Sequence, residues 1–173
     1  LSILLTLCLA FSLLPTAALA DEGPDPVAQI GETKYATLAE AVKKADSGAT
    51  VTLLKDTAVS AMIMLKKSLT LDLNGHKLNN EGNIDSWVQV IDNAKLTING
   101  TVKGSAAYGR MNLGIATDNN GSLEINGGIY AVGDDQTVLH INGTCMSSDV
   151  TINGATIKAT NDNGIQLNGK GTF

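Results

Sequence analysis

Two adjacent carboxylates are the residues of this chain best suited to catalysis. Asp134 and Asp135 are the one adjacent acid pair within the repeated part of the sequence. Paired carboxylates a few ångströms apart hydrolyse glycosidic bonds by acting as general acid and base. Consecutive side chains of a β-strand point to opposite faces, however, so at most one of the two would enter a shared cleft. A solvated turn is therefore the preferred interpretation of the pair.

Metal-binding patterns are weak in this sequence. His76 and His140 are the only histidines, and no HxxxH or CxxC spacing exists, which argues against a zinc site. The polar turns at 118–120 and 161–163 make Ca²⁺ the alternative, but neither has the spacing of a known calcium loop. We expect no metal and no other cofactor.

Aromatic rings are the third kind of candidate, because an exposed ring can stack on a sugar. Besides the terminal Phe173, the repeats contain Trp87, Tyr108 and Tyr130, which are the candidate ligand contacts. Trp87 directly precedes an expected strand, where its ring could close a gap at the edge of the core. Packing at the core or its rim is the preferred interpretation of Trp87.

Composition limits the class of protein. The 173 residues include 12 Lys and Arg against 17 Asp and Glu, a net charge of −5, and this acidic balance argues against a nucleic-acid partner. Apolar residues make up 43%, which excludes wholesale disorder. The 18 glycines and 3% aromatic residues favour many tight turns over a helical bundle.

The N-terminal segment differs from the rest of the chain. Residues 1–20 are uncharged, largely apolar and end in Ala18-Leu19-Ala20, and an acidic, Pro-containing linker at 21–26 follows. This pattern is typical of a secretory signal peptide that lacks its start. The alternative is a membrane anchor, but the apolar run is short for a helix that spans a membrane. We therefore expect a secreted or cell-surface protein without a membrane span after cleavage. Cleavage would leave Cys145 as a single cysteine, which favours a small buried side chain.

The elements that must position these candidates belong to a sequence repeat. Four similar segments, each with an Asn-Gly pair, begin at Leu69, Leu96, Leu123 and Val150, with a period of about 27 residues. A second, apolar series lies at Ile91, Ile115, Ile141 and Leu167, and a third at Lys77-Leu78, Val102-Lys103, Ile129-Tyr130 and Thr156-Ile157. Each repeat thus holds three short segments with the alternation typical of strands.

Strands this short bury little surface alone, so stacking of the repeats is expected. Equivalent residues would lie about 4.8 Å apart, with aliphatic columns inside. One column would contain Leu71 or Leu73, Ile98, Ile125 and Ile152, and another Ile91, Ile115, Ile141 and Leu167. The Asn-Gly pairs suit tight turns, and stacked Asn99, Asn126 and Asn153 would bond through their amides. Independent hairpins closed at each Asn-Gly are the alternative.

Residues 27–68 are expected to form an N-terminal cap and a first irregular coil. The cap would consist of a strand, a helix over 38–46 and a strand over 50–54. Thr37 and Glu40 form a capping-box pattern, and Gly48 would end the helix. The cap would cover one end of the apolar columns. Residues 69–173 would form the coils, and we expect the native protein to continue, because the next copy of the repeated segment would begin beyond Phe173.

This pattern resembles the right-handed parallel β-helices of the pectate-lyase-like superfamily. These have an all-β fold with three short strands per coil of about 25–27 residues. The segment from Tyr35 to Val42, followed by Gly48 to Asp56, is similar to the start of secreted repeat proteins of Gram-positive gut bacteria. The superfamily includes lyases, hydrolases, adhesins and inert scaffolds. The resemblance is therefore specific for the fold and weak for activity.

The resemblance also implies which sequence elements an enzyme of this superfamily would contain. Asp134-Asp135 looks like one element of polygalacturonase-type hydrolases, but their Asn-Thr-Asp, Gly-His-Gly and Arg-Ile-Lys elements are missing from this sequence. A lyase would need Arg or Lys as base on an exposed sheet face, and the only arginine, Arg110, is expected in a loop between coils.

We therefore expect an adhesin-like scaffold, more a binding protein than an enzyme, with glycans or host-cell surface molecules as partners. The alternative is a polysaccharide lyase or glycoside hydrolase that has part of its active site here, at Asp134, Asp135 and Arg110.

Overall fold

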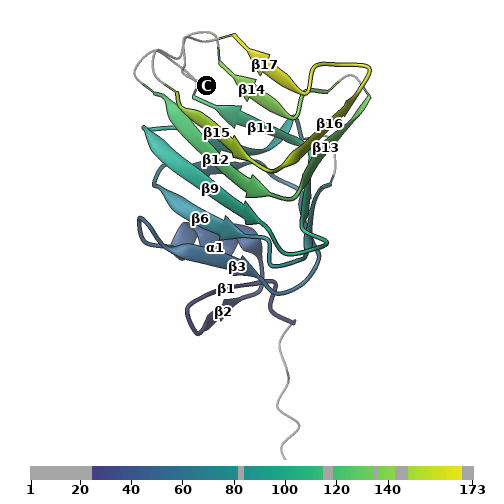
Figure 1. Ribbon diagram of the computed structural model, residues 1–173. Coiled ribbons are helices and arrows are strands. Elements are labelled where there is room, and N and C mark those ends of the chain that lie inside the picture. Colours follow the sequence, from purple (N-terminus) through teal and green to yellow (C-terminus); the bar gives the residue numbers. More distant parts are fainter. Residues whose placement is uncertain (1–24, 82–83, 115–118, 135, 143–147, 169–173) are drawn as a thin grey trace, which may run out of the picture.

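Short strands wind the chain into a right-handed parallel β-helix with three sheets (Figure 1). The computed structural model describes residues 25–81, 84–114, 119–134, 136–142 and 148–168. The expected signal peptide, Asp135 and Cys145 lie outside these residues. The one described helix is too short to cross a membrane.

The three sheets are called A, B and C. Sheet A consists of β1 Ala28–Ile30, β2 Thr33–Tyr35, β3 Thr50–Leu53, β6 Leu69–Asp72, β9 Ala94–Gly100, β12 Gly121–Gly127 and β15 Val150–Asn153. Sheet B consists of β4 Thr57–Val59, β7 Lys77–Asn80, β10 Ala106–Tyr108, β13 Ile129–Asp134 and β16 Thr156–Thr160. Sheet C consists of β5 Ile63–Leu65, β8 Ser86–Val90, β11 Arg110–Leu113, β14 Leu139–Ile141 and β17 Ile165–Leu167. From β3 onward, the chain visits A, B and C in turn, and each circuit adds one parallel strand to every sheet.

The first aliphatic column lies inside sheet A as predicted. Leu71 pairs with Ile98, Ile98 with Ile125, and Ile125 with Ile152 in the register of the parallel strands. Ile98 and Ile125 are completely buried, and Leu71, rather than Leu73, holds the lowest of the predicted positions. Stacked repeats, not independent hairpins, therefore build the core.

The second column differs from the prediction. The positions that pair through sheet C are Leu65, Val90, Leu113, Ile141 and Leu167. Ile91 follows the end of β8 and is buried at a corner, and Ile115 lies outside the described residues. Val90, one residue before Ile91, takes the inward position because side chains alternate along a strand. Leu113, two residues before Ile115, pairs with Val90 and Ile141 in the register.

The third series also needs one correction. Ala106 and Ala107, not Val102 and Lys103, pair with Lys77-Leu78 below and Ile129-Tyr130 above. Residues 101–105 form a longer turn, with Val102 largely exposed. The small Ala107 side chain consequently lies between Leu78 and the large ring of Tyr130.

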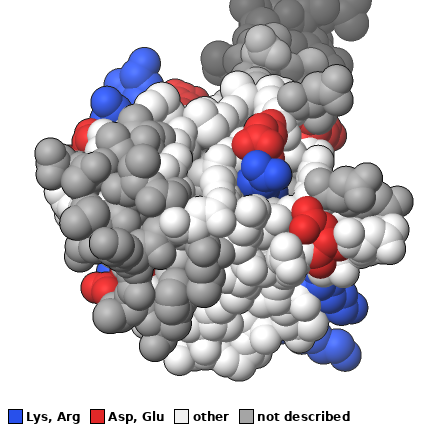
Figure 2. All heavy atoms as spheres, turned by 90° about the horizontal axis from the view of Figure 1, so that it is seen from above, with Lys and Arg blue, Asp and Glu red and all other residues white. Residues whose placement is uncertain are grey.

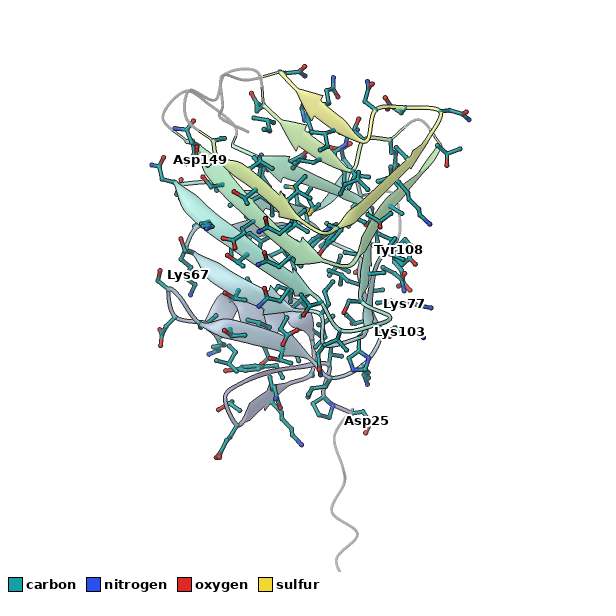
Figure 3. All side chains as sticks on the ribbon, viewed as in Figure 1. Asp25, Lys67, Lys77, Lys103, Tyr108 and Asp149 are labelled. Atoms are coloured by element: carbon teal, nitrogen blue, oxygen red, sulfur yellow. The ribbon has the colours of Figure 1, made fainter. Side chains whose placement is uncertain are left out.

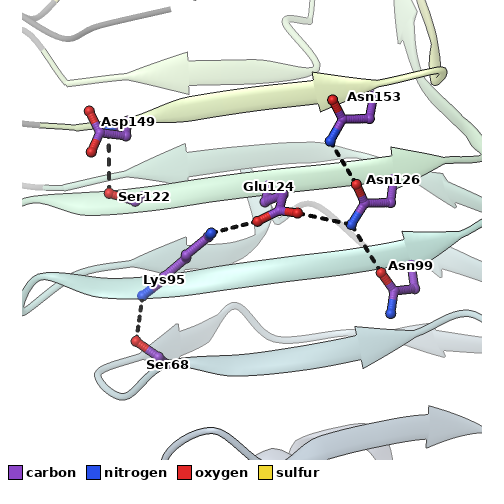
Figure 4. Close-up of polar contacts among 8 residues, drawn as sticks. All are labelled: Ser68, Lys95, Asn99, Ser122, Glu124, Asn126, Asp149 and Asn153. Carbon is purple, nitrogen blue, oxygen red and sulfur yellow. Dashed lines mark hydrogen bonds and ion pairs between the residues drawn. The ribbon is translucent and has the colours of Figure 1, made fainter.

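The outer face of sheet A carries the predicted asparagine ladder (Figure 4). Asn153 Nδ2 donates to Asn126 Oδ1 at 2.8 Å, and Asn126 Nδ2 donates to Asn99 Oδ1 at 3.2 Å. Glu124 accepts hydrogen bonds from Lys95 and Asn126, which hold the pKa of its carboxyl below the usual value. Neighbouring coils are therefore bonded through their side chains as well as their backbones.

The N-terminal cap closes the lower end of the β-helix. Helix α1, Leu38–Lys44, is two residues shorter than expected, and Thr37 Oγ1 accepts from the backbone N–H of Glu40 at 3.1 Å. Before it, β1 and β2 form a hairpin, and β1 pairs with β3 in antiparallel orientation. Leu38 and Ala41 are buried, so the helix covers the end of the apolar interior.

We predict that Ile98→Ala lowers the free energy of unfolding by about 2–5 kcal/mol, because it opens a cavity in the column of sheet A. Thr97→Ala, on the outward face of the same strand, should cost less than about 1 kcal/mol. Urea denaturation of both variants measures the difference, and equal losses would contradict the inward orientation of Ile98.

Candidate functional site

A groove of about 650 Å³ opens at the corner where the chain passes from sheet B to sheet C. Three consecutive coils line it. The lower coil contributes Asn80, Ile84 and Asp85, and the middle coil contributes Tyr108 and Gly109. The upper coil contributes residues 131–133 and Gln136. Figure 3 shows Tyr108 on the sheet B side of the molecule, away from sheet A. We call this site the corner groove.

Gly109 gives the corner groove its shape. Its φ of +103° is strained for residues with a side chain, and a Cβ there would lie 2.7 Å from Asn80 Cβ. The Gly109 N–H donates to the carbonyl of Ala131 at 2.9 Å, which ties the middle coil to the upper one. Asn80 Nδ2 donates to the Ile84 carbonyl at 3.1 Å, but its Oδ1 is shielded from solvent and has no partner. Asn80 therefore lines the groove with its side chain fixed in place, while its Oδ1 is buried against the protein.

An ion pair lies beside the groove, in which one guanidinium nitrogen contacts both oxygens of a carboxylate. Arg110 Nη1 is 2.8 Å from Asp85 Oδ1 and 3.0 Å from Asp85 Oδ2. The expectation that Arg110 lies in a loop is wrong, because it is the first residue of β11 and pairs with Ser86 of β8. A guanidinium held by a carboxylate stays charged, so Arg110 is poorly suited to act as a base.

The polar surface continues over the outer face of sheet C. Asn112 Nδ2 donates to Ser86 Oγ at 3.1 Å, and His140 lies next to Asn112 in the register of the strands. Burial lowers the pKa of His140, the charge of Arg110 lowers it further, and the Asp85 carboxylate opposes both. We name Asp85, Ser86, Arg110, Asn112 and His140 the sheet C cluster.

The other predicted ligand contacts lie elsewhere. Trp87 is 2% exposed and Tyr130 is 0% exposed, so neither ring offers a face to a ligand. Trp87 packs near Leu38 of the cap, and burial raises the pKa of the Tyr130 hydroxyl, which has no hydrogen-bond partner. Of the three aromatic candidates, only Tyr108 lines the corner groove.

The acidic candidates are only partly described. Asp134 is the last residue of β13, and its side chain is not among the described groups, while Asp135 lies outside the described residues. Gly133 and Gln136, which flank them, line the corner groove. The predicted pair is therefore close in sequence to the groove.

The calcium alternative has little support in the described part of the chain. At the turn 161–163, Asp162 Oδ1 accepts from the Asn163 N–H, and Asp162 Oδ2 lies 3.5 Å from Thr137 Oγ1. Among the described residues, no group of three or more His, Cys, Asp or Glu side chains could hold a metal ion. Asp118 of the other turn lies outside the described residues.

Sequence reasoning named Arg110 as a candidate but missed Asn80, Asp85, Ser86 and Asn112. The residues of the Asp85–Arg110 pair belong to different coils, and only the strand register brings them together. The available signal was the repeat itself: residues separated by about one coil become neighbours.

Charge is spread over the end of the molecule that Figure 2 shows. In this view from above, the described acidic and basic side chains lie in separate small groups and do not form one patch of a single sign.

Comparison of the chain with protein-family models, with curated proteins and with solved structures finds no match in any of the three. The parallel β-helix is present, and membership of the pectate-lyase-like superfamily stays a prediction. The corner groove itself is therefore the basis for a functional proposal.

We predict that Gly109→Ala lowers the free energy of unfolding by more than about 1 kcal/mol, because it combines strained backbone with a clash against Asn80. Gly133→Ala, which lines the same groove but meets no atom within 4 Å, should stay within about 0.5 kcal/mol of the wild type. Thermal unfolding of the two variants makes the comparison, and similar stabilities would contradict the close approach.

The pKa of His140 should respond in opposite directions to the two members of the ion pair. Arg110→Gln removes a repelling charge and should raise this pKa, whereas Asp85→Asn should lower it. The pKa of His140 in the folded state lies below the ordinary value of about 6.5, so protonation is less favourable in the folded than in the unfolded chain. His140 therefore lowers the free energy of unfolding as pH falls below that value. Titration of the imidazole by NMR measures both shifts, and two shifts in the same direction would refute the electrostatic explanation.

Proposed function

We propose that this protein is a non-catalytic, extracellular β-helix module that binds glycans in the corner groove. The observation that carries the proposal is the position of Tyr108, a partly exposed ring in a groove that also contains the polar side chains of Asn80, Asp85 and Gln136 beside the aliphatic Ile84 and Val132. Sugars combine an apolar face of C–H groups with a rim of hydroxyls. An aromatic ring beside fixed polar groups complements both.

The polar groups of the groove support this ligand class. Asn80 and Gln136 contribute amide groups to the lining, and amides can both donate to and accept from hydroxyl groups. Asp85 is exposed, and Arg110 holds its carboxylate in one orientation while leaving lone pairs for further donors. The volume of about 650 Å³ falls within the range of small-ligand sites and suits one or two sugar rings.

Export is inferred from residues 1–20. Their apolar run and small-residue end are typical of a cleaved secretory signal. An extracellular location would give the groove access to cell-surface and dietary polysaccharides, which is consistent with glycan binding.

A second candidate is cleavage of a polysaccharide in the same groove. It is favoured by one observation, namely that the neighbours of Asp134 and Asp135 line the groove that Asp85 also lines. The ion pair between Arg110 and Asp85 weighs against cleavage, because Arg110, the candidate base of a lyase, is bound to a carboxylate.

Binding of the full chain to pectic oligosaccharides and mucin O-glycans, measured by NMR titration, tests the proposal. Tyr108→Ala should weaken binding about tenfold or more, since stacking contributes of the order of 1.4 kcal/mol, while Tyr108→Phe should retain it. Gln136→Ala should weaken binding without removing the ring, and Thr97→Ala on sheet A should leave binding unchanged.

Product analysis separates the two candidates. Shortened chains of pectin or mucin glycans, lost in both Asp134→Asn and Asp135→Asn, would establish the enzyme and overturn the non-catalytic proposal. Binding that Tyr108→Ala leaves intact would overturn the assignment of the groove.

A further inference from the structure

A second groove, of about 410 Å³, lies at the capped end between α1 and β5. From the helix, Ala39, Val42 and Lys43 line it, and from the other side residues 61–67 do so. We call it the cap groove. It is separate from the corner groove and shares no lining residue with it.

The backbone of β5 faces the cap groove with an open edge. β5 is the outermost strand of sheet C and pairs with β8 on one side. The Leu65 carbonyl accepts from the Ile91 N–H at 2.9 Å, so Leu65 faces the β8 side. Because the backbone groups of successive residues point to alternate sides of a strand, the N–H and C=O of Met64 face the open side.

The cap protects the other sheets differently. β1 pairs with β3 and extends sheet A, and α1 packs against β3 and β4. Natural proteins usually cover or block exposed strand edges, since an open edge invites pairing with another chain. Among the described strands, only β8 pairs with β5, so the opposite edge of β5 is open to such pairing.

The cap groove is apolar inside. Met62 is 40% exposed and Met64 is 49% exposed, and both are among the most exposed large apolar side chains of the described residues. Methionine side chains are flexible and polarizable, so they adapt to varied apolar partners. Ala39 and Val42 extend this surface on the helix side.

Lysines surround this apolar surface in a chain whose net charge is −5. Lys43, Lys66 and Lys67 line the cap groove. Lys66 Nζ is 3.8 Å from Asp92 in a solvent-exposed and therefore weak pair, and Lys67 Nζ donates to the Lys43 carbonyl at 3.4 Å. The local positive charge is complementary to an acidic ligand.

We propose that the cap groove binds an extended, acidic segment of a partner polypeptide, which adds to β5 as a further strand of sheet C. The Met64 backbone would supply the main-chain hydrogen bonds, Met62 and Met64 would contact apolar side chains, and the three lysines would pair with carboxylates. Strand addition of this kind takes affinity from main-chain bonds and specificity from alternate side chains.

Fluorescence anisotropy with the full chain and a labelled seven-residue peptide, in which glutamate alternates with leucine or valine, tests the proposal. The peptide should bind, and a version with lysine in place of glutamate should bind at least about tenfold more weakly. Two further versions carry N-methyl groups at every second backbone nitrogen, one in each phase. At least one of them should lose about tenfold in affinity, because it lacks the N–H groups that pair with β5.

A matched pair of variants controls for overall charge. Lys66→Glu with Lys67→Glu should weaken peptide binding about tenfold or more. Lys77→Glu with Lys103→Glu makes the same change in net charge on the sheet B side, where Figure 3 shows both lysines far from Lys67, and should alter binding less than about twofold.

Three results would overturn the proposal. Equal losses of peptide affinity in both double variants would show that binding depends only on the net charge of the protein. Full binding by both N-methylated peptides would exclude strand addition. Dimers of the chain in sedimentation velocity that Met64→Lys abolishes would assign the edge to a second copy instead.

Discussion

The structure depends on vertical registration: each coil must place an aliphatic side chain directly over its equivalent in the coil below. Leu71, Ile98, Ile125 and Ile152 meet this condition in sheet A, and Val90, Leu113 and Ile141 meet it in sheet C. A slip by one residue would turn a whole strand outward, because side chains alternate. Most strand pairs therefore keep a continuous register, and the register shifts at Arg110/Met111 and Ala131/Asp134 occur in sheets C and B beside the corner groove.

The same constraint explains how much of the fold could be predicted. Sheet A repeats with a constant sequence spacing, so its column and its asparagine ladder were readable from the sequence. In sheets B and C, turns of unequal length move the inward position, so Ala107 replaced the expected Val102 and Leu113 took the position expected for Ile115. Periodicity identifies strands reliably only where the connecting turns have equal length.

The site was harder to predict than the fold for a related reason. Tyr108 could be selected by residue type, but nothing in its local sequence distinguishes it from Trp87 or Tyr130, which the register buries. Asp85 and Arg110 become partners only through coil stacking. The two outer faces also differ: in the asparagine ladder of sheet A, polar groups bond one another, whereas Asn80 Oδ1, Arg110 Nε and Asn112 Oδ1 near the corner groove lack partners.

The antiparallel hairpin β1–β2 favours folding that starts at the N-terminal cap and proceeds coil by coil. Its contacts and those of α1 are made by residues close together in the sequence, so this portion can form before the later coils exist. Each subsequent coil then needs only the coil beneath it as a template. This order of winding matches the order in which the chain is synthesised, so each new strand edge is covered by the coil that follows it.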